Sequence, residues 1–165
     1  MSRALLLLLC CACGTSRPAG GPGDAGPVDF TIGSIALHAG SGAAVQSAGL
    51  LRLYLSDQPD TCAAIHAVPV MTATTFSLRI TPPSDTTGRA TVVPPKATPA
   101  AGEATGAIAV ATGGVKKDGA DATDGSVSWA VNTDGSVTLT SIDVGFAGAS
   151  GRLATHGLLL AACAP

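Results

Sequence analysis

The chain has 165 residues, of which only 12% are charged, and a formal net charge of −2. An average soluble domain has about 25% charged residues, and this chain has no run of basic residues, which argues against nucleic acid or an anionic lipid surface as a partner. The 21 glycines and 11 prolines favour short strands joined by tight turns over amphipathic helices.

The first twelve residues have the pattern of an export signal. Arg3 precedes an apolar run over residues 4–11, which is too short to span a bilayer. The run ends in Ala12-Cys13, and a small residue directly before a cysteine resembles the lipobox of bacterial lipoproteins. In that family the signal is removed before the cysteine, and acyl chains such as palmitate on the cysteine hold the protein on the membrane. The resemblance implies a signal peptide over residues 1–12, a lipid anchor on Cys13, and a place in the bacterial cell envelope, at the outer membrane or the cell surface.

The next segment has the composition of a flexible linker. Residues 14–27 contain five glycines and three prolines and little that could build a core. A chain of this length and composition has a root-mean-square reach of roughly 20 Å. We therefore expect residues 13–27 to hold a folded domain, residues 28–165, off the bilayer.

From residue 28 onwards, apolar and polar residues alternate with a period of two, which is typical of half-buried strands. Gly33 and Ser34 break this phase after the first strand, which indicates a bulge. The segments with the clearest alternation are residues 28–32, 51–55, 76–80 and 127–131, with weaker ones at 89–93 and 104–111.

Residues 56–62 read Ser-Asp-Gln-Pro-Asp-Thr-Cys, and Asp60 or Thr61 can cap one helical turn from Cys62 to His66. This Ser-Asp-x-Pro-x-x-Cys turn after a strand, together with a final meander that ends in a cysteine, is similar to uncharacterised lipoproteins of high-GC bacteria. That resemblance implies no particular activity.

The pentapeptide Thr-Asp-Gly-Ser-Val occurs twice, at residues 123–127 and 133–137. Asp-Gly tolerates positive φ where a strand begins, and the ten-residue period fits one strand and one turn. The C-terminal third is therefore predicted to be an antiparallel meander of residues 126–131, 136–146 and 151–163. The whole pattern predicts an all-β fold, an antiparallel β-sandwich of about eight short strands, with a closed β-barrel as the alternative.

The cysteines predict one disulfide. Cys10 and Cys11 leave with the signal and Cys13 carries lipid, so only Cys62 and Cys163 remain. Two remaining cysteines in an exported protein are expected to pair. The alternative is a structural zinc site that adds His66 and His156 as ligands. Residues 156 and 163 would point to opposite faces of a regular strand, and an oxidising compartment favours the disulfide.

Three carboxylates lie close together in the sequence. Asp118, Asp121 and Asp124 fall within seven residues, and with the neighbouring glycines they predict an exposed loop over residues 118–125. Calcium prefers oxygen ligands of this kind, but the twelfth position, where an EF-hand has glutamate, is Trp129. We favour a solvated loop, with a calcium- or ligand-binding loop as the alternative.

The sequence has no catalytic signature. His38, His66 and His156 are the only histidines, and the chain lacks the G-x-S-x-G sequence of a nucleophile elbow. Glu103 is the only glutamate, which excludes a pair of catalytic glutamates. We expect no enzymatic activity and no cofactor.

The aromatic residues predict core positions more than a binding platform. Tyr54 alone falls on an outward phase, and one exposed tyrosine does not make a binding site. The four others fall on apolar phases: Phe30, Phe76, Trp129 and Phe146. We therefore expect a structural or adhesive, non-catalytic envelope protein whose partner the sequence does not identify; a binding module is the second hypothesis and an unrecognised hydrolase the third.

Overall fold

A computed structural model describes residues 28–66, 73–82 and 86–165. The expected signal peptide, the acylated Cys13 and the linker up to residue 27 lie outside the described residues. The described part is mostly β with one short helix, which confirms the expected all-β class. In chain order the elements are β1 (Val28–Ile32), β2 (Ile35–Ala39), β3 (Ser41–Ser47), β4 (Leu50–Ser56), α1 (Thr61–His66), β5 (Ala73–Ile80), β6 (Thr87–Val92), β7 (Glu103–Thr112), β8 (Val115–Val131), β9 (Val137–Phe146), β10 (Arg152–Thr155) and β11 (Leu158–Cys163).

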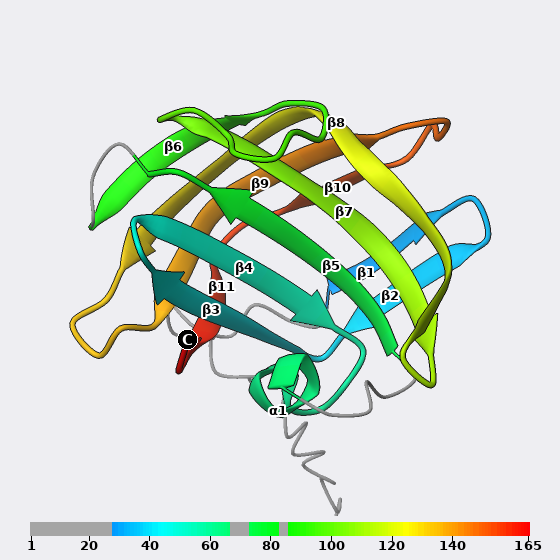
Figure 1. Ribbon diagram of the computed structural model, residues 1–165, viewed down its shortest axis with the longest axis horizontal. Helices are drawn as coiled ribbons and strands as arrows, with labels where there is room; N and C mark the ends of the chain where they lie inside the picture. Colours follow the sequence, from blue (N-terminus) through cyan, green and yellow to red (C-terminus); the bar gives the residue numbers. More distant parts are fainter. Residues whose placement is uncertain (1–27, 67–72, 83–85) are drawn as a thin grey trace, which may run out of the picture.

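Among the described residues, nine strands form one large sheet, and β1 and β2 form a separate antiparallel pair. The order in the large sheet is β10-β9-β11-β3-β4-β5-β7-β6-β8, and β8 also pairs with both β7 and β9. The pairings therefore form a closed circuit, and the curved sheet gives the molecule a sandwich- or barrel-like shape (Figure 1). Two pairings are parallel, β11 with β3 and β6 with β7, so the sheet is mixed and not purely antiparallel.

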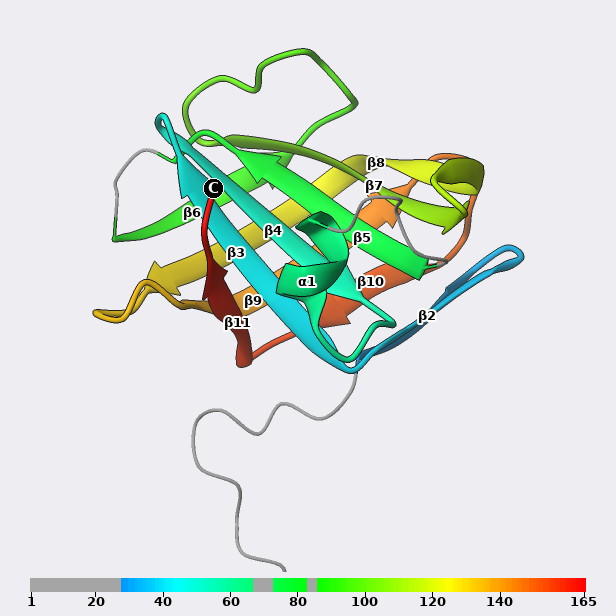
Figure 2. The same ribbon diagram turned by 60° about the horizontal axis from the view of Figure 1, so that its bottom comes forward.

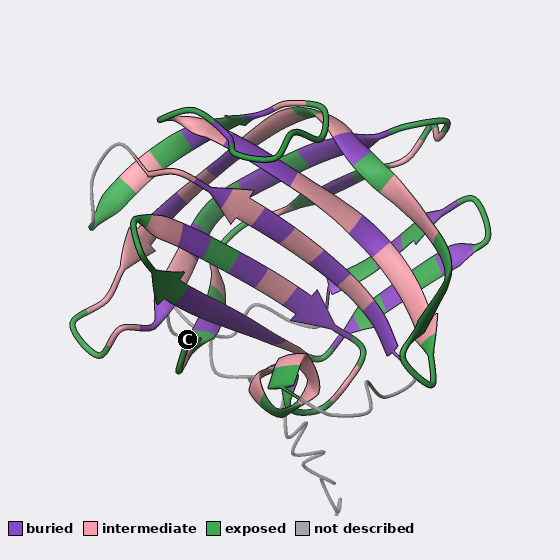
Figure 3. Cartoon of the chain, in the orientation of Figure 1, coloured by how far each residue is buried: buried purple, intermediate pink, exposed green. Residues whose placement is uncertain are grey.

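The period-two segments form strands as predicted. In β4, Leu51, Leu53 and Leu55 are buried, while Arg52 and Tyr54 lie on the opposite, outer face. The same alternation of buried and more exposed residues is visible along the neighbouring strands (Figure 3). The sequence pattern therefore assigns the inner and outer faces of the sheet correctly.

The phase break at Gly33 and Ser34 is a hairpin turn, and the expected bulge is wrong. Ile32 pairs with Ile35 across the turn, and Gly33 has a φ of 56°, which suits a two-residue hairpin connection. Apolar residues of β1 and β2 join the core cluster of the large sheet. The hairpin therefore covers part of the interior.

The two copies of the pentapeptide take different structures. Gly135 lies in the turn between β8 and β9, as the meander predicts, whereas Gly125 lies inside β8, next to a shift in the register with β9. The predicted strand start at residue 126 is therefore wrong, because β8 already begins at Val115. Its first residues pair with β7 in a long hairpin.

The predicted C-terminal meander is confirmed, with one interruption. The third strand is divided into β10 and β11 at His156 and Gly157. Both halves pair antiparallel with β9 in one continuous register, from Arg152 opposite Gly145 to Leu160 opposite Val137.

The core lies inside the curved sheet. All four aromatic residues expected there are buried: Phe30, Phe76, Trp129 and Phe146. The ring of Phe146 lies 5.4 Å from that of Phe30 and 5.9 Å from that of Phe76, between centroids. The hairpin and the large sheet are thus packed together through aromatic contacts.

The helix α1 packs on the outside of the sheet, over β3 and β4 (Figure 2). Asp60 caps it, as predicted, by accepting a hydrogen bond from the Ala63 N–H at 3.0 Å. Thr61 is buried, and its hydroxyl lies 2.6 Å from that of Ser41 on β3. At six residues α1 is the one helix among the described residues, and none there is long and apolar enough to cross a membrane.

Candidate functional site

The outer face of β4, β5 and β7 carries a shallow groove, which we call the outer groove. The strand register arranges its residues in rows across the sheet. Arg52 lies opposite Arg79, which lies opposite Thr105. The next row runs through Tyr54, Ser77, Ala107 and Asp121, and a third contains Thr75 and Ala109. Because most of these side chains are small, they leave a shallow depression on the outer face of the sheet.

Two hollows that share Tyr54 and Ser77 make up the groove. One, of about 320 Å³, lies between the two arginines, Thr105 and Asp121. The other, of about 310 Å³, lies beside α1 and is lined mainly by apolar atoms, including those of Ile65. The first hollow contains the charged side chains and is called the polar end of the groove, whereas the described lining of the second has no charged residue and is called the apolar end.

The loop between β6 and β7 forms the wall at the polar end, where it contributes Pro95. Arg79 Nη1 donates to the Ala97 carbonyl at 2.9 Å, and Thr81 Oγ1 donates to the Pro99 carbonyl at 2.9 Å. Lys96 forms an ion pair with Glu103 and holds the pKa of that carboxyl below its ordinary value. These contacts fix the loop, so the wall is preformed.

The polar end is electrostatically unusual. Arg52 and Arg79 stand directly opposite each other on antiparallel strands, and like charges in this position destabilise a sheet. Arg79 bonds to a neutral carbonyl, and Arg52 has no hydrogen bond or ion pair with a described residue. Asp121 lies across the groove and forms no ion pair with either arginine in the described part of the chain. Two arginine side chains therefore lie next to each other on the same face of the sheet, and neither is paired with a carboxylate of the described residues.

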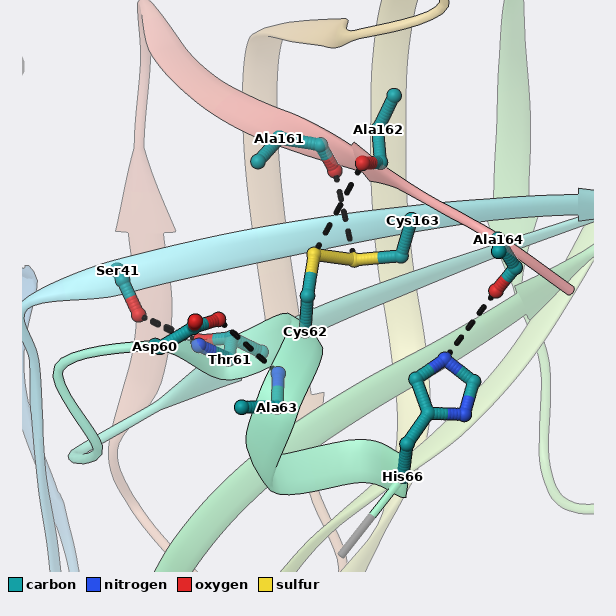
Figure 4. The surroundings of a disulfide bond; sticks show 10 residues. All are labelled: Ser41, Asp60, Thr61, Cys62, Ala63, His66, Ala161, Ala162, Cys163 and Ala164. Carbon is teal, nitrogen blue, oxygen red and sulfur yellow. Dashed lines mark hydrogen bonds between the residues drawn. A yellow bond between two sulfur atoms is a disulfide. The ribbon is translucent and has the colours of Figure 1, made fainter.

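The predicted disulfide is confirmed. Cys62 and Cys163 are bonded, with 5.7 Å between their Cα atoms, and join α1 to the end of β11 (Figure 4). Both sulfur atoms are thus unavailable for the alternative zinc site. His66 Nε2 lies 3.2 Å from the Ala164 carbonyl oxygen, and His156 lies in the break between β10 and β11.

The acidic loop expected over residues 118–125 is wrong, because these residues are part of β8. The strand separates the three carboxylates. Asp118 accepts a hydrogen bond from Ser34 at the tip of the β1–β2 hairpin, Asp121 lines the outer groove, and Asp124 forms an ion pair with Arg152. Among the described residues, no group of three His, Cys, Asp or Glu side chains is placed to hold a metal ion.

The three histidines lie apart. His38 lies 2.7 Å from Asp29 on the exposed face of the β1–β2 hairpin. In the part of the chain that the structure describes, none of His38, His66 and His156 forms a hydrogen bond with a serine.

Tyr54 lies on the outer face, as its strand phase predicted, whereas the arginine pair beside it was not predicted. Arg52 and Arg79 each lie between two apolar strand residues, which does indicate outward side chains. Their opposition depends on the register of β4 and β5, which the alternation alone does not determine. No protein-family model, curated protein or solved structure matches this chain.

Proposed function

We propose that this chain is an exported, lipid-anchored protein of the bacterial cell envelope with a non-catalytic, adhesive role. Cys13 is the anchor, and residues 14–27 are the linker to the β domain. The outer groove is the contact surface, and it binds an anionic group, either a carboxylate or a phosphate.

The Cys62–Cys163 disulfide supports export, because disulfides persist in oxidising compartments and are rare in the reducing cytosol. β1 begins at Val28, directly after the glycine- and proline-rich segment. This order of anchor, linker and domain fits a protein held a short distance above a membrane.

The binding role is inferred from the positions of Arg52 and Arg79, which lie opposite each other on neighbouring strands. An anion between the two guanidinium groups relieves their repulsion, and guanidinium binds carboxylate and phosphate through two parallel hydrogen bonds. Tyr54, Ser77 and Thr105 line the same hollow, and each of these residues has a hydroxyl group that can form a hydrogen bond.

The anchor is tested by intact-mass analysis of the membrane fraction. We expect a mature chain that starts at an acylated Cys13, and a Cys13→Ser variant that carries no lipid and is released from the membrane. An unmodified chain with a different N-terminus in the soluble fraction would contradict the anchor.

The groove is tested with the full-length protein in detergent and two immobilised polymers, polyglutamate and polyphosphate. Retention on one polymer identifies whether carboxylate or phosphate is bound. We expect Arg52→Gln to weaken retention by roughly tenfold, because a hydrogen bond to a charged group contributes about 1.5–3 kcal/mol.

Arg89→Gln is the matched control. Arg89 is also an exposed strand arginine, but it lies on β6, outside the groove, next to Ser126. Its replacement should leave retention unchanged. Equal losses in the two variants, or no retention of the unsubstituted protein on either polymer, would refute the role of the groove.

A further inference from the structure

The outer groove is long enough for an extended chain. Its polar end contains Arg79 and its apolar end contains Ala73, and these two residues lie six positions apart on β5. At about 3.3 Å per strand residue, the two positions are roughly 20 Å apart. An extended peptide covers that distance with about six residues. One continuous ligand can therefore contact both ends of the groove.

The groove is recessed below the surface around it. The outward residues Thr75, Ser77 and Arg79 of β5 are half-buried. On β6, outside the groove, the outward residues Arg89 and Thr91 are exposed. Figure 3 shows buried and half-buried residues alternating along β5, and exposed residues on β6. A chain laid along β5 would therefore lie in a depression and not on a flat face.

The middle of the groove is polar, which distinguishes a peptide from a hydrocarbon chain. The hydroxyl groups of Tyr54, Thr75 and Ser77 form no hydrogen bond with a described residue. A hydrocarbon chain over them would remove their water without replacing its hydrogen bonds, which costs free energy. The amide groups of a peptide backbone can donate to hydroxyl groups and accept from them. The groove therefore favours a peptide over an acyl chain.

The polar end selects acidic side chains. Neither Arg52 nor Arg79 is paired with a carboxylate of the described residues, and guanidinium groups bind carboxylates through two parallel hydrogen bonds. Asp121 is the one carboxylate in the described lining of this hollow, and β5 and β7 separate it from Arg52. The place for an acidic side chain is therefore over β4 and β5.

The apolar end selects apolar side chains. Ile65 on α1 and Ala109 on β7 line this hollow, and none of its described lining residues is charged. A carboxylate here would lose water without gaining a cation, which costs free energy, whereas an apolar side chain gains free energy by leaving water. The complementary peptide is therefore acidic at one end and apolar at the other.

We infer that the outer groove binds an extended peptide segment of about six residues. Its carboxylate side chains lie at Arg52 and Arg79, and its apolar side chains lie beside Ile65. The inference rests on the proposed anion-binding role of the two arginines, and it adds the class of partner: a polypeptide in which acidic and apolar residues are separated by a short spacer.

Two labelled hexapeptides test the inference. The first has two glutamates at one end, two leucines at the other, and a glycine and a serine between them; the second has serines in place of the leucines. Each is made in both chain directions. Fluorescence anisotropy measures their binding to the full-length protein in lipid nanodiscs, where no free detergent competes for the apolar end. We expect the leucine peptide, in one direction, to bind about tenfold more tightly than the serine peptide, because its leucines are partly buried.

Variants at the apolar end locate the leucines. Ile65→Ala should weaken the leucine peptide by about threefold and leave the serine peptide unchanged, which also shows that the variant is folded. Ala109→Phe fills the hollow from β7 and should reduce the affinity of the leucine peptide to that of the serine peptide. Thr91→Phe, at an exposed position on β6 outside both hollows, is the matched control and should change neither affinity.

Arg52→Gln should weaken both peptides alike, by roughly tenfold. Equal affinity of the leucine and serine peptides, with retention on polyglutamate, would overturn the peptide inference and leave the anion site in place. Retention on polyphosphate without binding of either peptide would overturn it too, because the site would then select phosphate. A leucine peptide that binds Ala109→Phe as tightly as the unsubstituted protein would show that its leucines lie elsewhere. Only the absence of retention on both polymers would refute the proposed function as well.

Discussion

At Gly125 the backbone of β8 has a φ of 120°, a conformation that residues with a side chain rarely adopt. A Cβ at this position would also collide with the Asp143 carbonyl oxygen on β9. Strain of this kind costs about 1–3 kcal/mol. We therefore expect Gly125→Ala to lower the free energy of unfolding by at least that amount, measured by chemical denaturation.

Gly40→Ala is the control for this prediction. Gly40 lies between β2 and β3, has no positive φ, and an added Cβ would meet no atom within 4 Å. Its replacement should change the free energy of unfolding by no more than about 0.5 kcal/mol. Similar losses for the two variants would show that β8 does not require glycine at position 125.

The ion pairs of Arg152 make the stability of the fold depend on pH. Arg152 on β10 contacts Asp124 at 2.6 Å and Asp143 at 2.7 Å. The hydrogen bond from Arg152 to Asp124 lowers the pKa of Asp124 below its ordinary value, and a hydrogen bond from Thr123 adds a smaller effect in the same direction. A carboxyl with a lowered pKa in the folded state stabilises the fold above its unfolded pKa, and this contribution is lost as pH falls through the folded pKa.

We therefore expect the unsubstituted protein to be more stable than Asp124→Asn at pH 7, with the difference shrinking below about pH 4. Thermal midpoints of both proteins between pH 7 and pH 2 measure it. Because the pair is exposed, 1 M salt should reduce the difference at pH 7. A difference that stays constant down to pH 2 would exclude the ionised carboxylate as its cause.

The alternation of apolar and polar residues along a strand was enough to predict which face of the sheet a single residue occupies. Phe30, Phe76 and Phe146 were placed in the core, and Tyr54 on the outer face, from strand phase alone. The pairing of Asp124 with Arg152 was not predictable in the same way. Those residues are 28 positions apart in the sequence, and three strands must align before their side chains meet.

At the scale of elements, β8 shows the limit of periodicity. The half from Val127 onwards alternates because one face is buried in the core. The beginning, with Lys116 and Lys117, is exposed on both faces, and Val115 is 55% exposed. Hydrogen bonds to β7 hold this end in a strand without a buried face. With no buried face there is no alternation, so the sequence resembles that of a loop.

The disulfide gives a prediction at the same scale. It joins α1 to β11 across a sequence separation of 101 residues. Closing a loop of about 100 residues stabilises a protein by up to about 4.7 kcal/mol in the chain-entropy model, and by about 2–5 kcal/mol in small secreted domains. We expect the double variant Cys62→Ser, Cys163→Ser to lose about 2–5 kcal/mol of unfolding free energy in denaturant.

Reduction of the unsubstituted protein should have the same effect as the double substitution, because both remove the same cross-link. Adding reductant to the double variant should then change nothing further. A double variant as stable as the oxidised protein would show that α1 and β11 are held together by their packing alone.

At the scale of the whole molecule, β11 closes the circuit of strands. Residues 158–160 pair antiparallel with β9, and residues 161–163 pair parallel with β3. The first pairing follows from a meander of neighbouring segments, and the sequence predicted it. The second joins segments more than 110 residues apart. No hairpin turn can indicate a parallel pairing, because parallel strands need a long connection.

The closing role of β11 leads to a prediction about two adjacent leucines. Leu160 is fully buried, and its side chain packs against Gly42 on β3, whereas Leu159 is 47% exposed on the other face. Leu160→Ala should lower the free energy of unfolding by about 2–5 kcal/mol, and Leu159→Ala by about 0.5 kcal/mol or less.

Hydrogen exchange distinguishes local fraying from opening of the circuit. If β11 closes the whole sheet, the amides of β3 and β9 lose protection together with those of β11 in Leu160→Ala, because both strands gain a free edge at once. The loss should then extend along β4, which pairs with β3 over seven residues. Faster exchange confined to β11, or an equal cost for the two leucine substitutions, would mean that the sheet is stable without its last strand.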